Sequence, residues 1–105
     1  MSTDLHKLQK DVYQNKLDKG FNTTDVALEF CRAHEELSEA FKKYHAKQEG
    51  VAEELADVAI FLLGMAEILG FDLEKELVRK IEINKKRKYK KENDVFVRIR
   101  TAEDP

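Results

Sequence analysis

The sequence predicts an all-α protein, a bundle of four helices, and three observations support that prediction. The only proline, Pro105, is the last residue, so no proline interrupts a helix. Three of the four glycines, Gly20, Gly50 and Gly70, divide the chain into segments of helical length. Within these segments, apolar residues recur every three or four positions. Because 105 residues suit one compact unit, we expect a single domain over 1–105, with a helical core at about 3–89 and an extended tail at 90–105.

The first two helices are predicted from their caps and their apolar stripes. Leu5, Leu8 and Val12 follow helical spacing in the first, which we expect at about 3–19. Residues 22–25 offer an N-cap for the second, expected at about 24–47. Its apolar stripe consists of Val26, Phe30, Ala33, Leu37, Phe41 and Tyr44.

The third helix is expected at about 51–69, and the fourth, capped by Asp72, at about 73–89. The short connection at 47–50 makes the second and third helices an antiparallel hairpin. Residues 58–63 of the third helix are apolar all round, and such a helix is buried on every side. Four short helices can hardly surround it, so we predict a homo-oligomer, either a dimer or a tetramer.

The segment DVFVRIR at 94–100 alternates between residue types as a β-strand does. No partner strand is evident elsewhere in the sequence. We therefore expect this segment to dock in an extended form or to pair between subunits.

Charge, cysteine content and hydropathy indicate the cellular compartment and limit the classes of partner. The net charge of −2 neither requires nor excludes a polyanionic partner. The basic run at 85–91, KKRKYKK, is not part of a recognisable nucleic-acid-binding fold, so binding to nucleic acid is not expected. The lone Cys31 can form no intramolecular disulfide and favours a reducing compartment. The N-terminus lacks an apolar signal core, and the apolar run 58–71 contains Glu67 and is shorter than the ~20 residues of a membrane span. We expect a cytoplasmic protein without a membrane partner.

Two pairs of carboxylates, each three residues apart, are the strongest chemical signal. Glu36 and Glu39 share one helix face, as do Glu54 and Asp57, and the predicted hairpin brings the pairs together. Clustered like charges raise one another's pKa, and a hard divalent cation relieves that conflict. Oxygen ligands suit Mg²⁺, with Mn²⁺ as a substitute, whereas no Cys or His pair stands at zinc spacing. A single EExxE run is most often a solvated face, and we assign Glu35 and Glu53 to that role, with Glu35 alternatively supporting the ligands.

A polar stripe on the fourth helix offers a site for phosphate. Lys80, Asn84 and Arg87 follow i, i+4, i+7 spacing, and a lysine, an amide and an arginine can bind phosphate oxygens. The alternative is that cations here complement the helix macrodipole. We prefer that alternative for the remaining lysines, namely Lys85, Lys86, Lys88, Lys90 and Lys91.

Taken together, ELSE at 36–39, ELAD at 54–57 and KIEIN at 80–84, followed by KRKY, resemble the MazG-like family of all-α nucleoside triphosphate pyrophosphohydrolases. The resemblance covers about residues 5–90 and implies a MazG-like bundle. It implies that Mg²⁺ is held by Glu36, Glu39, Glu54 and Asp57, and that Lys80 and Asn84 contact the triphosphate. Family members cleave a nucleoside or deoxynucleoside triphosphate to the monophosphate and pyrophosphate. The general base would be Glu36 or Glu39, and the choice between them stays open.

Two questions remain open at the level of sequence. Candidates for lining a base pocket are Phe21, Phe30, His34 and Phe61, although each residue type is more often part of a core. The alternative function is a catalytically idle helical module for oligomerisation or partner binding on the same scaffold.

Overall fold

The computed structural model describes residues 4–100, which contain four helices and a two-stranded sheet. The helices are α1 (Leu5–Lys19), α2 (Val26–His45), α3 (Val51–Leu69) and α4 (Leu73–Lys86), and the strands are β1 (Lys88–Glu92) and β2 (Val95–Ile99). The predicted all-α fold is confirmed. Residue 3 of the predicted first helix and residues 101–105 of the predicted tail lie outside the described range.

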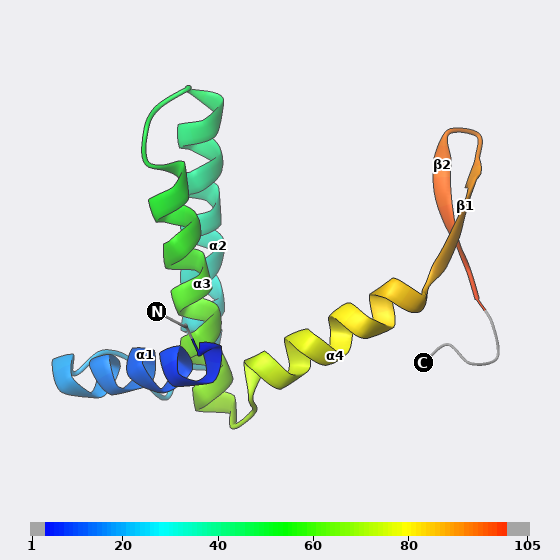
Figure 1. The fold of residues 1–105 in the computed structure, drawn as a ribbon. Helices are drawn as coiled ribbons and strands as arrows, with labels where there is room; N and C mark the ends of the chain where they lie inside the picture. The colour runs from blue at the N-terminus through cyan, green and yellow to red at the C-terminus, as the bar shows by residue number, and fades with distance from the viewer. Residues whose placement is uncertain (1–3, 101–105) are drawn as a thin grey trace. The chain divides into compact units, whose positions relative to one another are not determined.

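The chain forms two compact units, one ending at Leu73 and the other beginning at Glu74. In the first unit α2 and α3 run side by side as the predicted antiparallel hairpin, and α1 crosses α3 near its C-terminal end (Figure 1). No helix in the described part of the chain has the length and apolar character needed to span a membrane.

Side-chain caps and glycine turns fix the helix boundaries. The Asp4 carboxylate accepts hydrogen bonds from the backbone N–H groups of His6 and Lys7, and the Asp25 carboxylate accepts one from Leu28. Gly20 and Gly70 end α1 and α3 with positive φ angles of 70° and 82°, which glycine adopts without strain. These caps explain why the glycine spacing locates the helices well.

Small residues let the helices of the first unit approach closely. The buried apolar side chains of the described residues are few and mostly small: Ala33, Ala40, Leu63, Met65 and Ala66. Gly64 is also buried, and a Cβ atom there would lie 3.0 Å from Cε of Lys16 and 3.6 Å from Cγ1 of Val12. A side chain at position 64 would therefore crowd the buried side chain of Lys16, which would have to shift by a few tenths of an ångström.

Buried polar contacts then lock α1 in place. The Lys16 ammonium donates hydrogen bonds to the Glu29 carboxylate and to the carbonyl of Asn22, and both charged side chains are buried. At the other end of α1, the buried Gln9 donates to the Glu67 carboxylate at 3.0 Å and to the Phe71 carbonyl at 2.8 Å. These contacts join α1 to the start of α2 and to the turn after α3.

The second unit differs from the sequence prediction. α4 ends at Lys86, so the expectation that it reaches Tyr89 was wrong. The expectation that the C-terminal strand lacks a partner was also wrong, because β1 and β2 pair in antiparallel register from Lys88↔Ile99 to Glu92↔Val95. The two-residue connection, Asn93 and Asp94, has positive φ at both positions, as the tightest hairpin turn requires.

The buried Lys16–Glu29 pair leads to a stability prediction. Lys16→Met should lower the free energy of unfolding by about 3–5 kcal/mol, because it leaves the Glu29 carboxylate buried without a counter-charge. The double variant Lys16→Met/Glu29→Leu should recover most of that loss. Urea unfolding at one fixed protein concentration measures both. A double variant as unstable as the single one would contradict this account of the pair.

Candidate metal and nucleotide site

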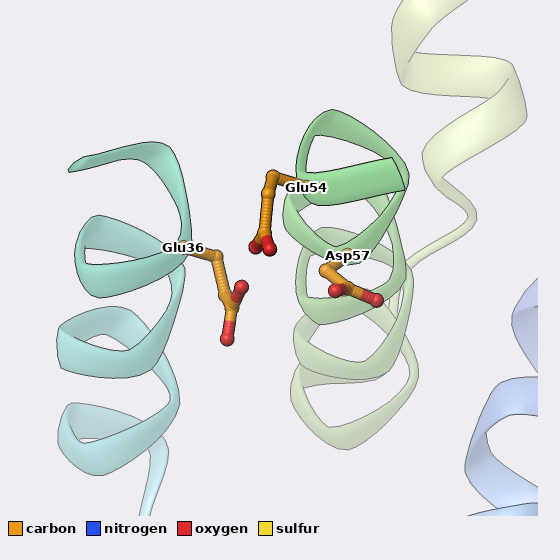
Figure 2. A group of neighbouring side chains, drawn as sticks. All are labelled: Glu36, Glu54 and Asp57. Atoms are coloured by element: carbon orange, nitrogen blue, oxygen red, sulfur yellow. The ribbon is translucent and has the colours of Figure 1, made fainter. Parts of the chain in front are cut away.

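The carboxylates predicted to bind metal meet between α2 and α3. Glu36, Glu54 and Asp57 each offer one oxygen, and these oxygens all lie within 4.8 Å of one another. Figure 2 shows Glu36 and Glu54 reaching from the two helices into the space between them, with Asp57 further along α3. All three side chains are partly buried, so they are accessible to an ion yet held by the helices.

The fourth predicted ligand, Glu39, stands outside this group of three. Its side chain is exposed, and its carboxylate accepts a hydrogen bond from Lys42 at 3.2 Å. Glu36 is therefore the member of the first acidic pair that the structure brings to the site. A role for Glu39 as a ligand or as the general base stays a prediction.

Lys43 compensates part of the negative charge in this cluster. Its ammonium donates a hydrogen bond to Oε1 of Glu54 at 2.7 Å. This contact raises the pKa of Lys43 and lowers the pKa of Glu54, which a hydrogen bond with Glu36 lowers further. Lys43 lies seven residues after Glu36 and so on the same face of α2, a spacing that the sequence analysis overlooked.

The pKa of Glu36 moves in the opposite direction. It is raised above its usual value by the hydrogen bond with Glu54, then by burial and by the charges of Glu54, Asp57 and Glu39. Glu36 thus retains a proton more readily than an isolated carboxyl group does. A divalent cation between the carboxylates would relieve that repulsion, and an all-oxygen ligand set suits Mg²⁺ or Mn²⁺. The residues present therefore fit the metal that the sequence predicts.

A cleft of about 590 Å³ opens beside the carboxylates. This volume is in the usual range for small-molecule pockets. Glu36 and Asp57 form part of its wall, and the remaining lining residues come from α1, the following loop and α3: Leu8, Asp11, Val12, Asn15, Lys16, Phe21, Ile60, Phe61 and Leu63.

Two of the four residues predicted to line a base pocket are part of this cleft. Phe21 and Phe61 line it, whereas Phe30 and His34 do not belong to its wall. The contribution of α1 to this cleft was not predicted from the sequence, although Asn15 follows Val12 by three residues on the same helix face. That polar residue continuing an apolar stripe was the available signal.

The predicted phosphate contacts belong to the second unit. Lys80 and Asn84 lie exposed on α4, and Arg87 comes one residue after the helix ends, where its backbone N–H donates to the Asn84 carbonyl at 3.2 Å. Substrate binding by Lys80, Asn84 and Arg87 stays a prediction.

The raised pKa of Glu36 leads to a pH-dependent prediction. A carboxyl group whose pKa rises on folding stabilises the fold while protonated and loses that contribution as pH rises through its pKa. Without metal at neutral pH, Glu36→Gln should therefore raise the melting temperature by a few degrees, and the gain should shrink in acid. Glu39→Gln is the matched control. An equal gain from Glu36→Gln at acidic and neutral pH would contradict the assigned cause.

Comparison with known proteins supports the interpretation of the motifs. The model of the MazG-like family matches residues 28–98, which is more than half of the chain. The matched segment contains the three clustered carboxylates and the predicted phosphate contacts. No match was found among curated proteins or among solved structures. The family match covers most of α2 and all of α3 and α4, so the chain belongs to the MazG-like family.

Proposed function

We propose that this chain is a Mg²⁺-dependent nucleoside triphosphate pyrophosphohydrolase, acting as a homo-oligomer in the cytoplasm. The observation that carries the proposal is the group of three carboxylates from two helices, with oxygens within 4.8 Å of one another, two of which, those of Glu36 and Asp57, line a cleft. Membership of the MazG-like family supports the reaction class, since its typical members release pyrophosphate from nucleoside triphosphates.

We propose separate tasks for the carboxylates and for the cleft beside them. Glu36, Glu54 and Asp57 would hold Mg²⁺, which when bound neutralises phosphate charge and activates water for attack. Phosphoryl transfer depends mainly on positioning and charge neutralisation, so the protein must chiefly fix its ligands and the substrate. A base entering the cleft would meet the rings of Phe21 and Phe61 and the amide of Asn15.

Proton removal and phosphate binding complete the proposal. Glu36 or Glu39 would accept the proton of the attacking water, as a carboxylate within hydrogen-bond reach of that water can, and the choice between them stays open. Lys80, Asn84 and Arg87 would contact the triphosphate oxygens, for which ammonium, amide and guanidinium groups are suitable donors.

A nucleotide panel with product identification tests the activity. With Mg²⁺ or Mn²⁺, the protein should release pyrophosphate and a monophosphate from at least one nucleoside or deoxynucleoside triphosphate. Glu54→Gln and Asp57→Asn should abolish release while preserving helix content, because each removes a metal ligand. Glu53→Gln is the matched control, an exposed carboxylate in the same helical turn.

The same preparation discriminates between an enzyme and an idle scaffold. Mg²⁺ binding to the folded state alone should raise the melting temperature of the wild type but not of Asp57→Asn. No pyrophosphate from the whole panel, together with an unchanged melting temperature, would contradict the proposal and favour the non-catalytic module.

The role of α4 has its own test. Lys80→Met should lower kcat/KM by about tenfold or more, since a hydrogen bond to a charged group contributes ~1.5–3 kcal/mol. Lys85→Met is the matched control, because Lys85 forms an exposed ion pair with Glu82 at 3.2 Å. Equal losses in the two variants would indicate a general charge effect rather than a specific contact.

A further inference from the structure

Basic residues gather at one end of the chain. Residues 85–100 contain eight lysines and arginines and two acidic residues, which gives this segment a net charge of +6. Residues 4–73, by contrast, contain eight basic and fourteen acidic residues, a net charge of −6. The small net charge of the whole chain therefore conceals a strongly basic segment, and such a segment attracts polyanions.

The structure gives this basic segment a form that the sequence did not predict. Residues 88–92 form β1, which pairs with β2 in a hairpin that follows α4 (Figure 1). Binding to nucleic acid was not expected because KKRKYKK lacks a recognition fold, yet a two-stranded ribbon is an element that nucleic-acid-binding proteins use. The side chains on its two faces decide what this hairpin can bind.

The register of the strands sorts the side chains onto two faces. Directly opposed residues share a face, and so do alternate residues along one strand. One face therefore carries two aromatic rings and two cations, and we call it the aromatic–cationic face: Tyr89, Lys91, Phe96 and Arg98. The tight turn at Asn93 and Asp94 fixes this register. A shift by one residue would put the two rings on opposite faces.

The other face of the hairpin is a different kind of surface. Three apolar residues share it with three charged ones: Val95, Val97, Ile99, Lys88, Lys90 and Glu92. The Glu92 carboxylate lies 2.7 Å from the Lys90 ammonium, so these two charges compensate each other away from the rings. Within the hairpin, the aromatic–cationic face is thus the one that places rings beside cations.

The aromatic–cationic face is open to solvent. Tyr89 is 52% exposed and Phe96 is 71% exposed. Lys91 is exposed as well, and its ammonium lies 3.5 Å from the carboxylate of Asp94 in the turn, whose side chain is 95% exposed. An ion pair between exposed groups is weak, so a phosphate can replace this partner. Both rings and the Lys91 ammonium are therefore accessible to a ligand.

The arrangement fits a single-stranded nucleic acid better than a duplex. Proteins bind single strands by stacking bases on exposed rings and holding the phosphates with cations. Tyr89 stands opposite Arg98, and Phe96 stands opposite Lys91, so the rings occupy diagonal positions ~7–8 Å apart. This separation exceeds the ~3.4 Å between stacked bases of a duplex strand. Each ring therefore suits a base that is unstacked from its neighbour.

We propose that the β1–β2 hairpin binds single-stranded nucleic acid through the aromatic–cationic face. Tyr89 and Phe96 stack on two bases, while Lys91 and Arg98 hold the phosphates beside them. The basic residues at 85–88 add attraction that does not depend on base sequence. The site lies within the second unit and uses none of the clustered carboxylates, so it stands independently of the proposed hydrolase activity.

Fluorescence anisotropy of the full chain with a labelled single strand of about 16 nucleotides tests the proposal. A metal chelator in the buffer keeps the carboxylate site out of the measurement. Tyr89→Ala and Phe96→Ala should each weaken binding roughly fivefold to a hundredfold, because each removes one base-stacking contact. Val95→Ala is the matched control, since it truncates an exposed side chain on the other face of the same strand, and it should leave the affinity unchanged.

The salt dependence of binding tests the phosphate contacts. Two contacts predict a log–log slope of about −1.4, because each contributes ~0.7 for a single strand. Lys91→Gln should flatten the slope by about 0.7, whereas Lys90→Gln on the other face should not. No binding at low salt, equal losses from Val95→Ala and Phe96→Ala, or equal affinity for a duplex would overturn the proposal. Displacement of the strand by excess nucleoside triphosphate would also overturn it, by locating the strand at the triphosphate site.

A fluorescent probe covers the case in which the alanine variants lose the hairpin. The chain contains no tryptophan, so Phe96→Trp introduces a single indole on the aromatic–cationic face. An unlabelled strand should quench its emission as a base stacks on it, whereas Val97→Trp on the other face should not respond. Quenching of Val97→Trp alone would contradict the proposal. A response of Phe96→Trp to phosphatidylserine vesicles but not to the strand would assign the face to a membrane surface instead.

Discussion

The mutual repulsion of Glu36, Glu54 and Asp57 is the constraint on which the rest of the structure depends. The carboxylate oxygens lie within 4.8 Å of one another, and the charges of Glu54 and Asp57 contribute to raising the pKa of Glu36. Without metal, Lys43 offsets part of this charge and Glu36 retains a proton more readily. Neither contact removes all of the negative charge, and a divalent cation between the carboxylates would neutralise the remainder.

The packing of the first unit also shapes the cleft. Gly64 admits α1 against α3, and the buried Lys16–Glu29 pair ties α1 to α2. The same crossing makes α1 a wall of the cleft, next to Glu36 and Asp57. The helix that carries Lys16 thus also places Asn15 in the wall of the cleft that we propose for the nucleotide base.

The sequence predicts the helical part of this structure closely and the remainder less well. Glycine turns and apolar spacing locate α3 at its observed bounds. The spacing of the acidic residues predicts that Glu36, Glu54 and Asp57 lie close together. The spacing does not show that Glu39 stands apart from these three, because i, i+3 spacing defines a helix face and not the direction of a side chain. In the structure Glu39 forms an ion pair with Lys42 instead. The β1 strand was missed because KYKKE reads as a basic helix end. The Asn93–Asp94 pair was the turn signal.

The most direct test of the central claim is the position of a bound ion. Mn²⁺ substitutes for Mg²⁺ at oxygen sites and can be located by anomalous diffraction from crystals of the full chain. The account predicts density between α2 and α3, within coordinating distance of Glu36, Glu54 and Asp57. Density elsewhere, or none at saturating Mn²⁺ with Glu54 still bound to Lys43, would contradict it.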